Sequence, residues 1–197
     1  KLPGAEKMSS RKGKIIEGEW LLDETRNIVE QSMLASGKWS TDQIGEISDK
    51  IAVAAIKYAF LKVSVGKDVI FDFEKSTSFD GDTGPYLLYV YARAASLLSS
   101  GGKFSDVNLG SLDAHATGLV RTLGRYPEIL LSASLSYSPS TLCSYLFDLG
   151  QSFNTFYQNV RILDSKEKES LLVIVSAVSK TMKHGLNVLG IEVVEKM

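Results

Sequence analysis

A short basic stretch near the N-terminus, "KMSSRKG", contains residues that could bind phosphate. Small serines and a flexible glycine let backbone N–H groups approach phosphate oxygens closely. Neighbouring Lys and Arg side chains offset the charge that spreads over those oxygens during phosphoryl or nucleotidyl transfer. The candidates for this chemistry are Lys7, Met8, Ser9, Arg11 and Lys12. A solvated lysine-rich turn is the commoner explanation of such a stretch, so its meaning depends on the rest of the chain.

Two pairs of aromatic and arginine residues could hold a nucleobase. Tyr89 and Arg93 are four residues apart, and Tyr157 and Arg161 repeat this spacing, with Asn154 nearby. Residues four apart share one face of a helix, and a ring beside a guanidinium on an exposed face is a good platform for an unstacked base. Most aromatic residues around Tyr157 are nevertheless expected in the core.

Helical spacing and capping signals predict the elements that position these residues. The fold is expected to be all-α, with at most one short strand at the alternating Val69, Phe71 and Phe73. The first predicted helix runs from an Asp23 cap to Gly37. The second begins at Ser40, in a capping box with Gln43, and ends at about Val63, with the inward-facing residues Ile44, Ile47, Ile51, Ile56, Ala59 and Phe60. The later helices are predicted from Pro85 to Gly101 and Gly102, from Leu112 to Leu123, from Pro127, from Pro139 to Leu163, and onward from an Asp164–Glu167 capping box. Within the helix from Pro139, a buried stripe is predicted at Leu146, Leu149, Phe153, Phe156 and Val160.

The composition excludes several classes of function. The net charge of −1 gives no strong overall field, so a polyanionic partner would have to meet a local patch. Cys143 is the single cysteine, and His115 and His184 lie far apart, so no metal site is expected. The apolar run from Leu171 to Val178 is too short to span a membrane. A reducing, cytoplasmic location is therefore predicted.

Taken in order, three motifs resemble the C-terminal half of the arginyl-tRNA synthetase family of class I enzymes. "KMSSRKG" resembles the signature loop KMSKS. "FDFEKSTSFDGDTGPYLLYVYARAASL" resembles the entry into the helical anticodon-binding domain of the DALR type, and "YLFDLGQSFNTFYQNVRIL" resembles its most recognisable helix. The closing "LGIEVVEKM" is also similar to the family's C-terminus, so the likeness extends over essentially the whole chain.

The resemblance implies a division of the chain into two parts. Residues 1–75 would be the helical tail of a catalytic domain with its KMSKS-like loop, and residues 76–197 would be the α-helical anticodon-binding bundle. No Rossmann-type strand and helix alternation with a HIGH motif occurs in this sequence, so the chain is expected to be a fragment that is inactive alone. This chain has Ser10 at the position of the second lysine of the KMSKS motif, and the basic residues Arg11 and Lys12 follow it in the sequence.

The resemblance also implies partners and roles. The parent enzyme would activate arginine with ATP and Mg²⁺ and transfer it to tRNA(Arg). It would act as a monomer with no membrane partner, and the fragment itself would need no cofactor. Lys7, Ser9 and the following basic residues would contact ATP phosphates. The anticodon loop would be met by Tyr89, Arg93, Asn154, Tyr157, Arg161 and the C-terminal Met197.

Three other interpretations stay open at this point. The chain could come from a related class I synthetase, notably the cysteine-specific one. It could be a free-standing helical RNA-binding module, or a purely structural helical interaction domain. The sequence upstream of this chain would separate the first of these from the arginine enzyme, because a cysteine enzyme should carry metal-ligating cysteines there.

Overall fold

A computed structural model describes residue 2 and residues 17–37, 39–102 and 112–197. The described residues form helices and no strand, which confirms the all-α prediction. The helices are α1 (Gly18–Ser36), α2 (Thr41–Leu61), α3 (Phe73–Thr77), α4 (Gly84–Gly101), α5 (Ala114–Gly124), α6 (Tyr126–Leu135), α7 (Pro139–Asn159) and α8 (Lys168–Val188).

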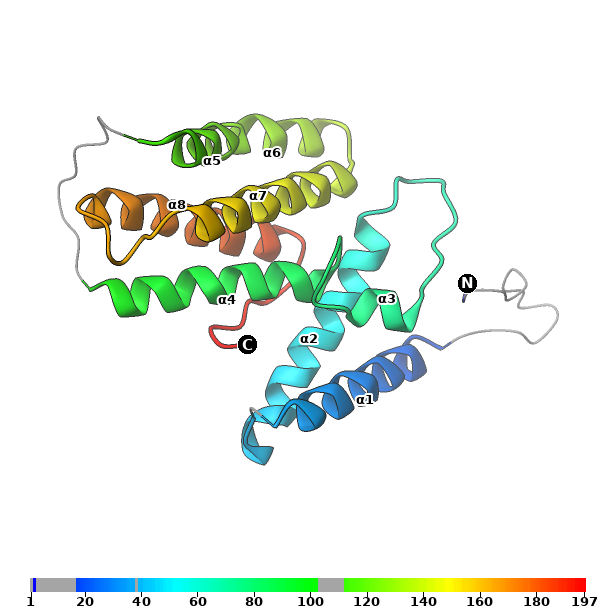
Figure 1. The fold of residues 1–197 in the computed structure, drawn as a ribbon. Coiled ribbons are helices and arrows are strands. Elements are labelled where there is room, and N and C mark those ends of the chain that lie inside the picture. The colour runs from blue at the N-terminus through cyan, green and yellow to red at the C-terminus, as the bar shows by residue number, and fades with distance from the viewer. Residues whose placement is uncertain (1, 3–16, 38, 103–111) are drawn as a thin grey trace.

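The helices form two groups that meet at α2 and α4 (Figure 1). Helices α4 to α8 build a bundle, in which α4 packs on α8, and α5 and α6 both pack on α7. Helices α1 and α2 form a pair beside this bundle, with the short α3 against them. The chain ends in a tail that passes α4 and stops near α2 (Figure 1). This tail therefore brings the C-terminus to the junction of the two groups.

The bundle is held by the predicted apolar stripe of α7. Leu146, Leu149, Phe153 and Phe156 are all fully buried, as the spacing indicated. They belong to one core cluster that also takes in residues of α1 and α2, so the two helix groups share a continuous apolar interior. Val160, the last predicted member of the stripe, is only half-buried and lies beyond the helix end.

Close backbone contact fixes the crossing of α2 and α4. A Cβ atom added to Gly84 would lie 2.2 Å from the carbonyl oxygen of Ala54, so only glycine allows this approach. Beside the crossing, the buried Tyr58 hydroxyl lies 2.5 Å from the Asp82 carboxylate and 3.1 Å from the carbonyl oxygen of Cys143 in α7. Lys62 donates to the Asp82 carbonyl oxygen at 2.6 Å. The junction therefore combines tight packing with satisfied polar groups.

Several predicted helix starts and stops are confirmed. Gly37 ends α1 with a positive φ of 64°, the conformation that favours glycine. Ser40 precedes α2, although its hydroxyl donates to the Gln43 side chain and caps no backbone N–H. Proline stands in the first turn of α4, α6 and α7, and Gly101 and Gly102 end α4. The helix predicted over residues 112–123 is shifted by one or two residues and begins after an Asp113 cap.

Other local predictions are wrong. Helix α1 begins at Gly18, so Asp23 lies inside it and pairs with Arg26 instead of capping. Helix α8 begins at Lys168 after Glu167, whose side chain makes no capping bond, so the Asp164–Glu167 capping box does not form. Phe60, which the spacing predicts to face inward, is instead 46% exposed near the end of α2.

The strand predicted around Val69 to Phe73 is also absent from the described residues. Asp72 caps the short helix α3 there, because its carboxylate accepts a hydrogen bond from the Lys75 backbone N–H at 3.1 Å. Phe71 and Phe73 pack edge to face in a small cluster, with ring centroids 5.2 Å apart. Their alternation therefore reflects burial in this cluster and not pairing with another strand.

Candidate nucleic-acid interface

Arg93 lies at the centre of the candidate site, between the rings of two tyrosines. It is one helical turn after Tyr89 on α4, and its guanidinium carbon lies 4.5 Å from the centroid of that ring. The same carbon lies 4.7 Å from the centroid of Tyr157, near the end of α7. A cation over an aromatic face is attracted by the ring quadrupole, so both rings orient the guanidinium. The predicted pair of Tyr89 and Arg93 is confirmed as a contact.

Hydrogen bonds fix the guanidinium further. One terminal nitrogen of Arg93 donates to the Asn154 side-chain oxygen at 2.6 Å, and the other donates to the Tyr89 hydroxyl. The Asn154 amide nitrogen donates in turn to the Tyr86 hydroxyl at 2.9 Å. Burial raises the pKa of Tyr86, and the hydrogen bond from Asn154 opposes that rise. Asn154 thus positions Arg93 and links α7 to α4.

Arg161 does not pair with Tyr157 as the spacing of four predicted. Helix α7 ends at Asn159, and the next residue, Val160, has extended backbone angles of −117° and 125°. Two residues that are four apart share a face only while the helix continues. Arg161 is exposed beyond the helix end, and the cation that contacts Tyr157 is Arg93 of α4.

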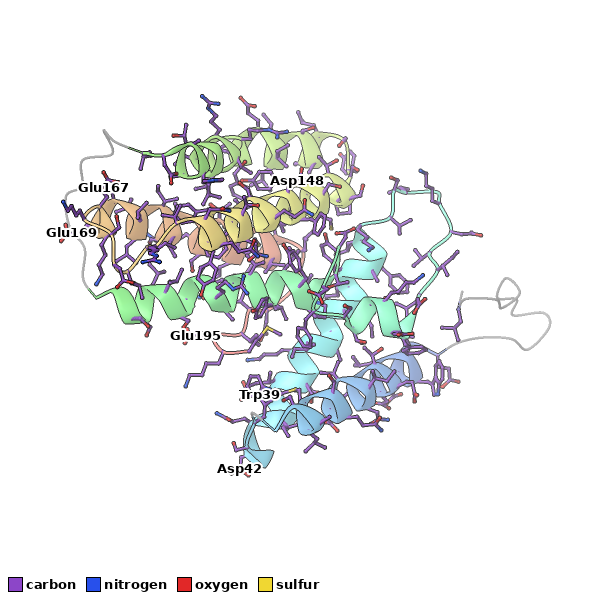
Figure 2. The ribbon with its side chains drawn as sticks, in the orientation of Figure 1. Trp39, Asp42, Asp148, Glu167, Glu169 and Glu195 are labelled. Atoms are coloured by element: carbon purple, nitrogen blue, oxygen red, sulfur yellow. The ribbon has the colours of Figure 1, made fainter. Side chains whose placement is uncertain are left out.

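An open hollow of about 730 Å³ lies beside these rings. Tyr89, Arg93 and Tyr157 form part of its wall, and the C-terminal Met197 lines it too, so the structure brings four of the predicted site residues together. The remaining lining residues are Trp39, Gln43, Ala92, Ser96, Leu97, Ser100, Leu163, Glu195 and Lys196. Glu195 lies on the C-terminal tail below α4, and Trp39 lies by the turn between α1 and α2 (Figure 2).

Two groups of lining residues were missed from the sequence. Trp39 lies in the turn between α1 and α2 and Gln43 in the first turn of α2, while Glu195 and Lys196 precede the predicted Met197. A tryptophan within the turn signal "GKWS" was a usable sign for Trp39, because a turn normally exposes its side chains. The position of the tail had no local sequence signal beyond the family resemblance.

The five loop residues predicted to contact ATP phosphates, Lys7, Met8, Ser9, Arg11 and Lys12, lie outside the described residues. Within the described ranges, no group of three or more His, Cys, Asp or Glu side chains could hold a metal ion. His115 and His184 are exposed helix residues, and Glu167 and Glu169 are exposed at one end of the bundle (Figure 2). None of the described helices has the length and apolar character needed to cross a membrane.

Residues 87–197 match the family described as the DALR anticodon binding domain. This match covers more than half of the chain. The chain belongs to the DALR anticodon-binding domain family. The match begins in α4 and extends to the C-terminus, so it includes all the residues of the hollow except Trp39 and Gln43.

Relatives of known name extend the similarity over the whole chain. The chain is 35% identical over 198 aligned residues to "Arginine--tRNA ligase 1" of Bacillus thuringiensis subsp. konkukian, which covers 100% of this chain and 35% of that protein. It is 34% identical to "Arginine--tRNA ligase" of Lactococcus lactis subsp. lactis, over 98% of this chain and 35% of that one. The chain thus spans about a third of the length of these relatives.

The fold is similar to that of a solved Thermus thermophilus arginyl-tRNA synthetase, with a TM-score of 0.89 and 27% identity. The likeness covers 100% of this chain and 34% of that one. A Plasmodium falciparum arginyl-tRNA synthetase has the same fold, with a TM-score of 0.81 over 93% of this chain. The resemblance first indicated by three sequence motifs is therefore confirmed. The predicted boundary between residues 75 and 76 stays a prediction.

Proposed function

We propose that this chain is the C-terminal part of an arginine–tRNA ligase, and that the hollow beside Arg93 receives unpaired bases of the tRNA anticodon loop. The observation that carries the proposal is the convergence of Tyr89, Arg93, Tyr157 and Met197, from two helices and the C-terminal tail, on one open hollow. The membership of the DALR family and the arginine-specific names of the relatives support it. These names favour the arginine enzyme over the cysteine-specific one.

The geometry suits recognition of a base in a single-stranded loop. Arg93 is already held between two rings and hydrogen-bonded to Asn154, so little side-chain freedom is lost when RNA binds. Tyr157 is 39% exposed, and an unpaired base can stack on its ring. Because the net charge of the chain is only −1, such local contacts must supply most of the affinity.

The roles of the side chains follow from their contacts. Tyr157 offers its exposed ring for stacking, and Arg93 places a fixed positive charge beside that ring. Asn154 and Tyr86 act through Arg93, because their hydrogen bonds hold it in place. Met197 and Lys196 would close the hollow from the tail. Arg161, exposed beyond α7, has the smaller role of an outer phosphate contact.

The proposal extends to the parent enzyme. It would activate arginine with ATP and Mg²⁺ and then transfer it to the terminal ribose of tRNA(Arg), acting as a cytoplasmic monomer. The KMSKS-like loop of this chain, with Lys7, Ser9, Arg11 and Lys12, would stabilise charge on the ATP phosphates. The remaining catalytic groups would come from the part of the relatives that this chain does not cover.

Footprinting on an arginine tRNA tests the proposed function. The transcript is cleaved by hydroxyl radicals with and without the purified chain, and protection is mapped along the RNA. We expect protection in the anticodon loop and its stem. An Arg93→Ala variant should lose protection of the anticodon loop before it loses protection of the stem. Protection elsewhere only, or no protection at concentrations where the chain is folded, would contradict the proposal.

A further inference from the structure

Trp39 forms a side of the hollow that the DALR match does not include. It lies in the turn between the Gly37 that ends α1 and the Ser40 that precedes α2. Figure 2 shows it by this turn, on the side of α2 toward the C-terminal tail that carries Glu195. The hollow is therefore lined both by tyrosines of α4 and α7 and by a tryptophan next to the other helix group.

The indole of Trp39 is held in place before any ligand binds. It is half-buried and packs against the main core cluster, and it also borders a smaller hollow of about 250 Å³. Tyr89 and Met197 border both hollows as well, so the three side chains form a shared partition. A ring that is packed on one side and open on another is a good stacking surface, because binding costs little further ordering.

Two polar side chains that line the hollow with Trp39 suit the edge of a base, whereas the cations Arg93 and Lys196 on the same lining suit a phosphate. Gln43 offers an amide that can donate and accept hydrogen bonds, and Glu195 offers a carboxylate that accepts only. A carboxylate attracts the amino groups of adenine, cytosine or guanine and repels phosphate oxygens. The volume of about 730 Å³ exceeds what the single base on Tyr157 needs. There is thus room and chemistry for a second base.

We propose that Trp39 stacks on a second unpaired base of the loop, next to the base held by Tyr157 and Arg93. The site would take an RNA nucleobase with an exocyclic amino group, its edge facing Gln43 and Glu195. This inference rests on the proposed function and adds a contact from outside the DALR match. It makes the helix pair α1 and α2 part of the recognition surface and not only a support for the bundle.

The two tryptophans of the chain allow a direct test, because Trp20 is the only other one. Trp20 is 45% exposed near the start of α1, where it packs edge to face on Phe73, and it does not line the hollow. In a Trp20→Phe variant all tryptophan fluorescence comes from Trp39, and in a Trp39→Phe variant it all comes from Trp20. A dye-labelled anticodon stem-loop of an arginine tRNA reports binding separately, by anisotropy.

We expect the stem-loop to quench the fluorescence of the Trp20→Phe variant and to leave that of the Trp39→Phe variant unchanged. Trp39→Ala should weaken binding roughly 5- to 150-fold, the range for one stacked base, while Trp20→Ala should not weaken it. Normal binding without quenching of Trp39 would overturn this inference and leave the proposed function standing. Absence of binding by the wild-type chain would overturn the proposed function itself. The quenching measurement also stays decisive if Trp39→Ala fails to fold.

Discussion

Tyr157 and its neighbour Phe156 form a matched pair for separating recognition from stability. Tyr157 is 39% exposed and contacts the Arg93 guanidinium, while Phe156 is fully buried in the core. Truncating Tyr157 to alanine removes one exposed cation–π contact, worth about 0.5–1 kcal/mol. It also removes a ring contact to Phe153, with centroids 6.3 Å apart, worth about 0.5–1.5 kcal/mol. The expected loss of stability is therefore about 1–2.5 kcal/mol.

Phe156→Ala should cost much more, about 3–5 kcal/mol, because it leaves a cavity in a packed core. For a chain of this size, 1 kcal/mol lowers Tm by about 2–4 °C. The expected falls in Tm are thus about 2–10 °C for Tyr157→Ala and about 6–20 °C for Phe156→Ala. The affinity per folded molecule should change in the opposite order. Tyr157→Ala should raise the Kd for the arginine stem-loop roughly 5- to 150-fold.

The assay combines thermal melts followed by circular dichroism with anisotropy titrations of the labelled stem-loop at one fixed salt concentration, since affinity for RNA depends on salt. The titrations are run at a temperature where both variants are folded. The reasoning is refuted if Tyr157→Ala lowers Tm as much as Phe156→Ala and leaves Kd unchanged. Tyr157 would then be a core residue, and the RNA-facing surface would lie elsewhere.

The structure and sequence support three further predictions. Arg93→Ala should raise the Kd for the stem-loop roughly 5- to 30-fold, whereas Arg161→Ala should change it less than about twofold, as measured by the same titrations. Equal losses for the two variants would contradict the central place of Arg93 in the site. Burial raises the pKa of Cys143 from its ordinary 9.0 to about 12, so the thiol should react with Ellman's reagent at pH 8 only after unfolding. Because the folded chain keeps this thiol protonated to higher pH than the unfolded chain, its contribution to stability is complete below about pH 9 and is lost as the pH rises toward 12. Tm should therefore fall over that window, and it should fall less in Cys143→Ala; an equal slope in the variant would argue against burial as the cause. The isolated chain should give no ATP–pyrophosphate exchange with arginine and tRNA, and in a full-length enzyme Lys12→Ala should slow adenylate formation more than it weakens tRNA binding. Exchange by the chain alone, or equal losses for Lys12→Ala, would contradict the proposed division of labour.

Local sequence patterns were sufficient for most of the helices. The stripe from Leu146 to Phe156 has the spacing of a buried helix face, and all its members up to Phe156 are buried because α7 packs on several neighbours. Prolines and glycines marked helix starts and stops because they restrict or free the backbone. The same patterns failed at Val160, where no breaker residue signals the end of α7. The chain turns there and buries Ile162 against the core, a tertiary effect that periodicity does not register.

The candidate site was only partly predictable for the same reason. Tyr89 and Arg93 meet within one helix, so their spacing was enough to predict the contact. The contact of Arg93 with Tyr157 joins residues on different helices, and Trp39 shares a hollow with residues of α4 in a fold where α2 packs on α4. Such meetings depend on how the helices pack. The family resemblance supplied Met197, which no local pattern indicated.

The most direct test of the account is base discrimination by the chain itself. Every arginine codon has guanine in its second position, so arginine anticodons share a central cytosine. Two labelled stem-loops that differ only in this base, cytosine or uracil, are titrated with the wild-type chain at the same salt. We predict a Kd roughly fivefold or more higher for the uracil loop, as expected when about 1 kcal/mol of base-edge hydrogen bonding is lost. Equal Kd values for the two loops would contradict the claim that this chain reads the anticodon of arginine tRNA.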